Sequence, residues 1–147
     1  MPTAHLSRQY HFSASHRLHS EAYSVEQNRA VFGKCNNPHG HGHNYMVQVT
    51  LSGPVDPVTG MVCDLALLDA FAHRNLVQRF DQTNLNTLQC FENTVSTTEN
   101  LSIEIHRIFA DFGAARLERV HVEETSNNSF DYVGDGGVDN VPASGTI

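Results

Sequence analysis

The stretch that decides the fold is residues 33–51, which read GKCNNPHGHGHNYMVQVTL. Its second half alternates regularly, and one face would carry His41, His43, Tyr45, Val47, Val49 and Leu51. Because successive side chains of a strand point to opposite faces, this pattern predicts a half-buried β-strand. Its apolar face begins with two histidines. The asparagines, glycines and proline ahead of it predict a loop.

An earlier segment shows the same alternation. From residue 10 onward, every second position gives Tyr10, Phe12, Ala14 and His16. This predicts another half-buried strand, and its apolar face ends in a histidine. Residues 17–40 between the two strands are polar and rich in breakers, so we expect an irregular connection.

The rest of the chain predicts two helices followed by two strands. Asp64 is a candidate N-cap for a helix to about Phe80, and Ser96 with Glu99 fits a capping box for a helix over 97–112. Alternation predicts strands over 117–125 and 129–133, and the Gly- and Asp-rich residues 135–147 predict a loose tail. The order ββααββ indicates one α+β domain over residues 1–134. Its two helices cover one face of an antiparallel sheet.

Composition narrows the class of protein. The chain has 147 residues, 39% of them hydrophobic and 17% charged, which is typical of a globular domain. A net charge of −7 argues against a nucleic-acid partner. The sequence has neither a long apolar run nor a signal-like start, so we expect no membrane association and a cytoplasmic location. The three cysteines cannot all pair, which favours free thiols.

The histidines at the strand ends form a candidate metal site. His41 and His43 leave the same face of one strand, and His16 ends the matching face of the other. Three imidazoles suit Zn²⁺ and leave a fourth position for water or substrate. An isolated His-x-His pair is more often structural, and only the third histidine makes zinc the better interpretation. His39 shares the face of His41 and His43, so spacing alone leaves the binding pair open.

Several longer motifs point to a known family. They are FSASHRL (12–18), GKCNNPHGHGHNY (33–45), DPVTGMV (56–62), VSTTEN (95–100) and VEETSNN (122–128). Together they closely resemble the 6-pyruvoyltetrahydropterin synthase family from about Tyr10 to Gly134. The resemblance implies a T-fold subunit. It also implies a homo-oligomer, commonly a hexamer, with active sites between subunits.

The resemblance also implies roles for single residues. His16, His41 and His43 match the zinc ligands, Cys35 the catalytic cysteine, and Asp81 the aspartate of an Asp-His pair from a neighbouring subunit. Glu124 matches the pterin anchor, with Thr97, Thr98 and Glu99 lining the pocket. The implied reaction is the elimination of triphosphate from 7,8-dihydroneopterin triphosphate by a lyase of tetrahydrobiopterin biosynthesis. Lys34, the only lysine, lies in the segment that we expect to face the phosphates.

One position departs from the family pattern and keeps alternatives open. Gln82 stands where the family has histidine, and an amide cannot carry a proton as imidazole does. The protein could therefore bind zinc and pterin with weak turnover. Cys35 also stands three residues before His39-Gly40-His41, the spacing of 6-carboxytetrahydropterin synthase in queuosine biosynthesis. A generic three-histidine zinc hydrolase would explain the ligands but leave Cys35 and Glu124 without a role.

Overall fold

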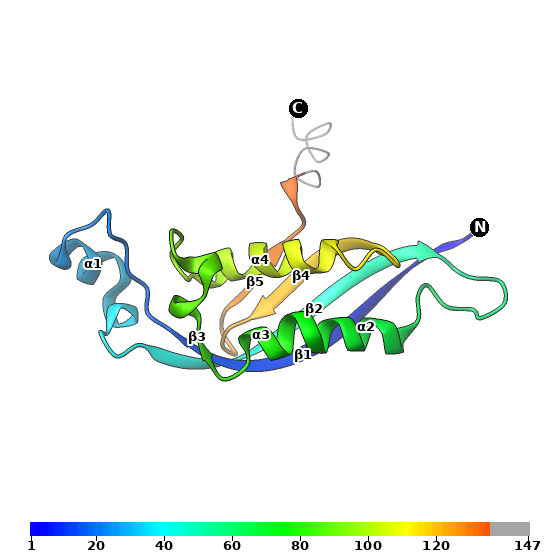
Figure 1. The fold of residues 1–147 in the computed structure, drawn as a ribbon. Helices are drawn as coiled ribbons and strands as arrows, with labels where there is room; N and C mark the ends of the chain where they lie inside the picture. Colours follow the sequence, from blue (N-terminus) through cyan, green and yellow to red (C-terminus); the bar gives the residue numbers. More distant parts are fainter. Residues whose placement is uncertain (136–147) are drawn as a thin grey trace, which may run out of the picture.

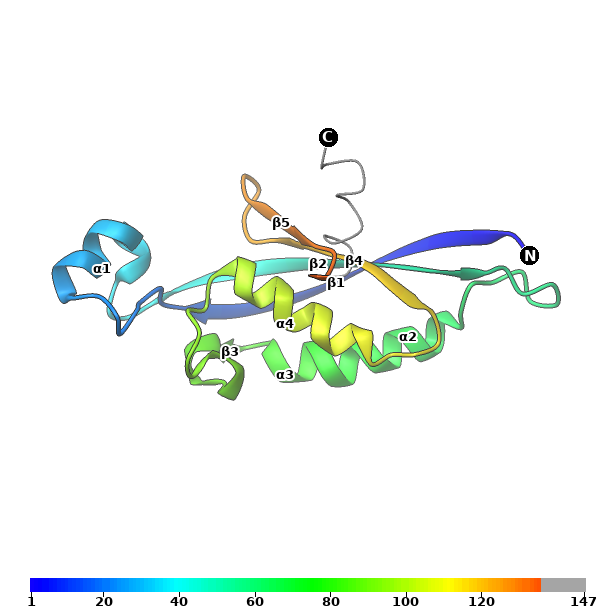
Figure 2. The same ribbon diagram turned by 90° about the horizontal axis from the view of Figure 1, so that it is seen from above.

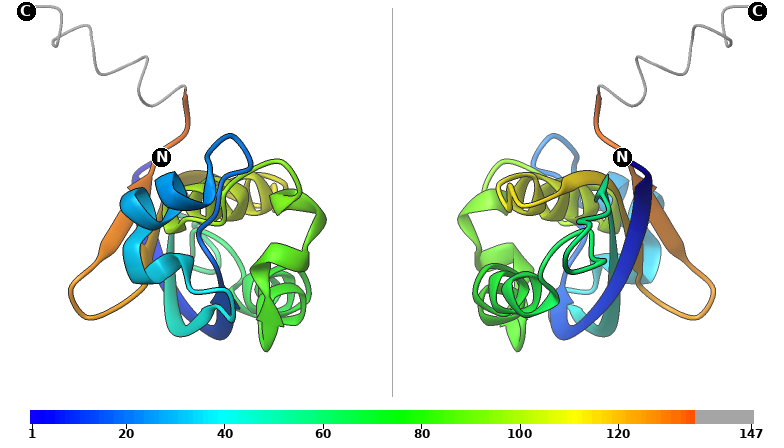
Figure 3. Two further views of the ribbon diagram at one scale, coloured as in Figure 1. Left: turned by 90° about the vertical axis from the view of Figure 1, so that its left-hand side faces the viewer. Right: turned by 90° about the vertical axis from the view of Figure 1, so that its right-hand side faces the viewer.

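The computed structural model describes residues 1–135, which form a five-stranded sheet with helices on one face (Figure 1). The sheet order is β3-β1-β2-β4-β5. The strands are β1 (Thr3–His16), β2 (His41–Pro54), β3 (Thr83–Asn84), β4 (Arg116–Glu123) and β5 (Ser129–Tyr132). The helices α2 (Leu65–Ala72), α3 (Gln78–Phe80) and α4 (Thr98–Ala110) form the second layer, which is clearest from above and end-on (Figures 2 and 3). The α+β class is confirmed.

The two long strands β1 and β2 are antiparallel over their whole length, from Thr3 opposite Pro54 to His16 opposite His41. On the helix side, Tyr45, Val47, Val49 and Leu51 of β2 are fully buried, as their alternation predicts. β1 begins at Thr3, well before the alternation from Tyr10 indicates. In its first half only Leu6, opposite Leu51, is a large apolar residue packed on the core, and the outward face carries polar cross-strand contacts such as Ser7 with Thr50 at 2.8 Å. Such polar pairs add to the stability of a strand whose hydrophobic pattern is weak.

The helical layer contributes the other side of the core. Asp64 caps α2 as predicted, because its Oδ1 accepts from the Ala66 N–H at 2.8 Å. Between α2 and α3 the chain makes a wider π-helical turn over His73–Val77, so the predicted single helix is interrupted. Its apolar stripe is nevertheless continuous and buried through Leu68, Ala72, Leu76 and Phe80. Burying each large apolar side chain stabilises the fold by about 1.5–3 kcal/mol.

The predicted capping box of the next helix is wrong. The N-cap of α4 is Thr97, whose Oγ1 accepts from the Asn100 N–H at 3.2 Å. Ser96 is fully buried one residue earlier, and Glu99 is exposed in the first turn. Two adjacent hydroxyl residues could each cap, and the path of the chain into the helix selects the second.

The segment expected to be irregular also holds regular structure. Residues 17–40 contain α1 (Val25–Phe32) and a 3₁₀ turn over Gly33–Asn36. A capping box of Ser24 and Gln27 starts α1. Asn28 is its only buried residue, so it has no apolar stripe from which to predict it. α1 stands apart from the other helices, beyond the end of β1 (Figures 1 and 2).

The sheet is mixed and not purely antiparallel, which corrects a second detail of the prediction. β3 runs parallel to β1, with Ala14 opposite Thr83 and Ser15 opposite Asn84. A strand of two residues gives no alternation in the sequence. Of the tail expected to be loose, residues 136–147 lie outside the described part of the chain. Within residues 1–135, no helix is both long and apolar enough to span a bilayer.

Candidate metal and ligand site

Three imidazoles converge where β1 ends and β2 begins. The strand pairing sets His16 directly opposite His41 and places the small Ala14 opposite His43. One ring nitrogen from each histidine lies within 4.8 Å of the others, and the Nε2 atoms of His16 and His41 are 3.2 Å apart. Two nitrogens on a tetrahedral zinc would be about 3.3 Å apart, given Zn–N bonds of about 2.0–2.1 Å. The strand geometry alone thus gathers the three predicted ligands.

A backbone carbonyl sets the orientation of His16. Its Nδ1 lies 2.7 Å from the Ser96 carbonyl oxygen, which can only accept, so Nδ1 carries the proton. Nε2 is therefore left with a lone pair directed at the other two rings. Gly40 brings the chain back beside this histidine with φ +71°, and a Cβ there would stand 3.1 Å from the His16 carbonyl oxygen. A glycine is required at this close approach.

The chemistry of these residues fits a metal ion. His43 Nε2 is buried and has no hydrogen-bond partner among residues 1–135. Burial lowers the pKa of both His16 and His43, and neighbouring imidazoles lower it further, whereas Glu124 opposes the shift. These histidines are therefore neutral near pH 7, as metal binding requires. Three nitrogen donors with an open fourth position form the arrangement of catalytic zinc sites.

A carboxylate completes the site. Glu124 follows β4, and its Oε2 lies 3.8 Å from His16 Nε2 and 3.7 Å from His43 Nε2. The buried Thr98 hydroxyl donates to the same oxygen at 2.6 Å. This bond joins the start of α4 to the end of β4. Glu124 thus faces His16 and His43.

We expect the metal-free protein to lose stability in mild acid because of these histidines. Their pKa values are lowered from 6.5 in the folded state, so below about pH 6.5 the unfolded chain binds protons that the folded chain does not. The stabilising contribution is complete above that pH and is lost as the pH falls toward the folded pKa values. Urea unfolding of chelator-treated protein at pH 7.5 and 5.5 measures the effect.

A matched pair of variants isolates the contribution of the site. His43→Gln should reduce the difference in unfolding free energy between the two pH values. His11→Gln should leave it unchanged, because His11 is exposed on the opposite face of the sheet. Equal reductions in the two variants would contradict the assignment.

The other predicted site residues lie elsewhere in the chain. Cys35 is half-buried in the 3₁₀ turn, where its carbonyl accepts from the Leu18 N–H at 2.9 Å, and Lys34 beside it is exposed. Asp81 Oδ1 accepts from the Ser13 N–H at 2.8 Å. Within residues 1–135, no hydrogen bond or ion pair links any of these three to the histidines. Thr97 and Glu99 belong to the first turn of α4, as described above.

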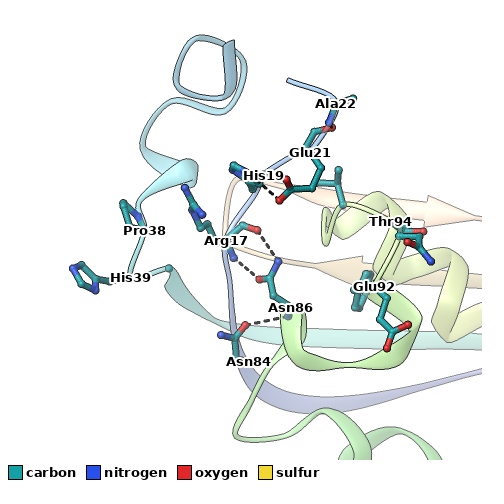
Figure 4. Close-up of a pocket in the computed structure, with 15 residues that line it drawn as sticks. Arg17, His19, Glu21, Ala22, Pro38, His39, Asn84, Asn86, Glu92 and Thr94 are labelled. Carbon is teal, nitrogen blue, oxygen red and sulfur yellow. Dashed lines mark hydrogen bonds and ion pairs between the residues drawn. The ribbon is translucent and has the colours of Figure 1, made fainter. Parts of the chain in front are cut away.

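A polar cleft of about 560 Å³ is lined by residues that follow β1, precede β2 and lie in the loops after β3. Asn86 lines the cleft and makes paired bonds to the backbone of Arg17, at 2.7 and 2.9 Å, as Figure 4 shows. His19 and Glu21 face each other at 3.3 Å, whereas His39 points away. The ligand histidines and Glu124 do not line this cleft. Spacing alone left open whether His39 belongs to the histidine cluster. His39 is exposed and lies outside the cluster that contains His41 and His43.

Two members of the site were not predicted from the sequence. The Ser96 carbonyl that orients His16 is a backbone group. Every residue has one, so the sequence gives no indication of this contact. Tyr45 forms the base of the site, and its ring centroid lies 5.6 Å from that of His43 and 6.4 Å from that of His16. Its position two residues after His43 on the same face was the available signal.

The fold and the site together define a class of protein. Its members have an α+β fold in which three imidazoles and one carboxylate lie close together. The sequence profile of the 6-pyruvoyl tetrahydropterin synthase family matches residues 5–135. The human 6-pyruvoyl tetrahydrobiopterin synthase is 46% identical over 134 residues, covering 90% of this chain and 92% of the human one. The solved Caenorhabditis elegans 6-pyruvoyl tetrahydropterin synthase superposes with a TM-score of 0.88 at 43% identity, covering 92% of this chain and 98% of that one. The chain therefore belongs to the 6-pyruvoyl tetrahydropterin synthase family, and its fold is the T-fold of that family.

Proposed function

We propose that this protein is a zinc-dependent 6-pyruvoyltetrahydropterin synthase, a lyase that converts 7,8-dihydroneopterin triphosphate to 6-pyruvoyltetrahydropterin with loss of triphosphate. The observation that carries the proposal is the meeting of three neutral imidazoles with Glu124 at one point of a T-fold subunit. The human and nematode relatives, which carry this activity in their names, support the choice of reaction.

The proposed metal is zinc, held by His16, His41 and His43. An all-imidazole donor set and neutral ligands favour Zn²⁺ over Mg²⁺ or Ca²⁺, which prefer oxygen. Zinc bound there would act as a Lewis acid on the side-chain oxygens of the substrate, which would acidify the protons on the carbons that bear them. The chain's own part is to hold three lone pairs in place, and Ser96 does this for His16.

The proposed pterin anchor is Glu124. A carboxylate can accept two parallel hydrogen bonds from the amino group and ring N–H of a pterin. Thr98 supports this role because its hydroxyl fixes one carboxylate oxygen. Thr97 and Glu99 remain predicted pocket residues at the start of α4, although Thr97 already uses its hydroxyl as the helix cap.

The proposed general base is Cys35, which would remove a proton from a carbon that bears a hydroxyl group. A thiolate in a polar, half-exposed turn beside Lys34 is suited to that role. By contrast, burial raises the pKa of the Cys63 and Cys90 thiols, which supports structural roles for them. Lys34 is exposed in the same turn, where it is available to the triphosphate.

The proposed active unit is a homo-oligomer, such as a hexamer, with sites between subunits. Two features support this. Within residues 1–135, no hydrogen bond or ion pair joins Cys35 to Asp81, and a second copy could supply the partner that each of them lacks. β3 covers β1 only at Ala14 and Ser15, which leaves most of that edge available for pairing. Light scattering of the purified protein tests the assembly.

A cytoplasmic location is part of the proposal. Cys35, Cys63 and Cys90 are all free thiols, which is the usual state in a reducing compartment. Cell fractionation with an antibody to the chain tests it.

We expect Gln82→His to increase turnover. Gln82 has φ +59°, and its N–H donates to the Ser13 carbonyl at 2.6 Å, so it sits at a tight turn beside Asp81. Histidine tolerates positive φ better than most residues and adds the proton carrier that an amide lacks. General acid–base groups typically contribute about 10²–10⁴-fold, and we expect kcat to rise about tenfold or more.

Gln82→Asn is the matched control because it keeps an amide and also tolerates this backbone conformation. It should leave kcat near the parent value. If Gln82→His turned over no faster than Gln82→Asn, another group must already perform that proton transfer.

Product analysis after incubation with 7,8-dihydroneopterin triphosphate and Zn²⁺ tests the proposed function. The pyruvoyl product supports it. A carboxy product with acetaldehyde would instead identify a 6-carboxytetrahydropterin synthase. Pterin that is bound but unconverted would identify a binding protein.

A further inference from the structure

The edge of β1 that faces away from β2 is covered by one short strand as it approaches His16. This strand is β3, which pairs with β1 only at Ala14 and Ser15. The chain then leaves the sheet in a 3₁₀ turn over Leu85–Thr87, so the main-chain pairing ends one residue before the metal ligand. Any further contact with β1 from this segment has to come from a side chain.

That side chain is Asn86. Its Oδ1 accepts from the Arg17 N–H at 2.7 Å, and its Nδ2 donates to the Arg17 carbonyl at 2.9 Å (Figure 4). The carboxamide thus makes the pair of bonds that two facing residues of antiparallel strands exchange. Asn84 fixes the turn itself, because its Oδ1 accepts from the Asn86 N–H at 3.0 Å. One amide therefore holds both backbone groups of the residue that follows His16.

Ser96 connects the Arg17 backbone to the ring of His16. Its hydroxyl donates to the Arg17 carbonyl at 3.4 Å, and its own carbonyl accepts the His16 Nδ1 proton at 2.7 Å. Ser96 and His16 are both buried, so neither side chain has room to follow a displaced backbone. A shift at Arg17 therefore alters the alignment of the imidazole with the carbonyl that orients it.

We propose that Asn86 is a positioning residue for the metal site: by fixing the Arg17 backbone, it keeps His16 Nε2 directed at the other two ligands. Within residues 1–135, no hydrogen bond or ion pair joins Asn86 to the three imidazoles, so it acts through Arg17 and Ser96. The inference rests on the zinc site of the proposed function. It adds a residue that supports one ligand of that site.

Asn86→Ala should lower zinc affinity about tenfold, because groups that orient a metal ligand typically contribute about 10–100-fold and Asn86 acts at one further remove. Asn86 is exposed, so the substitution leaves no cavity in the core. Competition with a chromophoric chelator measures the affinity. The visible absorption of the cobalt-substituted protein, which depends on ligand geometry, should also change.

The metal-free protein gives a readout that needs neither zinc nor substrate. Nitrogen-15 NMR of the imidazoles should show His16 of the parent as one tautomer, with the proton on Nδ1 and bonded to the Ser96 carbonyl. In Asn86→Ala the same ring should show a mixture of tautomers, because its carbonyl partner is no longer held in line.

Asn75→Ala is the matched control. Its amide also donates to a backbone carbonyl, that of Phe71 at 3.0 Å, but it lies in the π-helical turn of the helical layer. Its removal should lower the melting temperature and leave zinc affinity, cobalt absorption and the His16 tautomer unchanged. A purely structural Asn86 would behave in the same way.

A milder variant keeps the test open if Asn86→Ala does not fold. Asn86→Asp retains the acceptor for the Arg17 N–H and loses only the donor to the Arg17 carbonyl. It should change the His16 tautomer in the same direction and lower zinc affinity by a smaller factor. If the folded Asn86 variants kept the zinc affinity and the His16 tautomer of the parent, this inference alone would be overturned. A parent protein that binds no zinc would overturn the proposed function as well.

Discussion

His41→Ala should lower zinc affinity by more than about 100-fold, because even the loss of a residue that merely orients a ligand costs about 10–100-fold. Turnover should fall with the metal. His41 is the informative ligand to remove because it is only half-buried, whereas His16 is 1% exposed and bonded to the backbone of Ser96. Removing His16 would disturb packing as well as metal binding. Zinc content after dialysis and kcat measure the outcome.

His39→Ala is the control for that experiment. It removes the same side chain two residues earlier, from an exposed position that precedes β2. Zinc and turnover should both be retained. If His39→Ala lost zinc as fully as His41→Ala, His39 would have to be included among the zinc ligands.

Cys35→Ala should lower turnover by about 10²–10⁴-fold and keep the zinc, because it removes a general base and no metal ligand. Cys35 lies outside the group of ligand atoms formed by the three histidines. The contrast with His41→Ala therefore separates proton transfer from metal binding. Steady-state turnover and metal analysis on the same preparations give both readouts.

The remaining cysteines provide the comparison. Cys63→Ala and Cys90→Ala remove half-buried thiols whose pKa values are raised by burial, and turnover should stay within a few fold of the parent. Retained turnover in Cys35→Ala would exclude Cys35 as the base.

The sequence predicts those parts of the fold in which one face is buried along a whole element. β2 illustrates this, because its inward positions from Tyr45 to Leu51 are apolar and every one is fully buried. α1 illustrates the opposite case, since a helix with only Asn28 buried leaves no periodic signal. β3 is too short to show alternation, and its pairing depends on where the loop after α3 meets β1.

The candidate site also has parts that the sequence predicts and parts that it does not. Pairing of β1 with β2 follows from two alternating segments, and it brings His16, His41 and His43 together. The interaction of Ser96 with His16 involves a carbonyl that every residue possesses, so the sequence carries no sign of it. Likewise, the path of the chain decides that Thr97 caps α4 and that Ser96 does not. The roles of Cys35 and Asp81 still rest on the family resemblance, because no hydrogen bond or ion pair within residues 1–135 joins them to the three histidines.

The pairing of His16 with His41 also determines where the chain can accept insertions and deletions. The segment between these residues holds the exposed helix α1, so an insertion near residues 21–23 would lengthen a connection and leave the ligand geometry intact. A single residue inserted between His43 and Tyr45 would reverse the facing of both histidines relative to the rest of β2. Homologous chains of different length should therefore vary before Gly33 and keep the spacing from His41 to Leu51 constant.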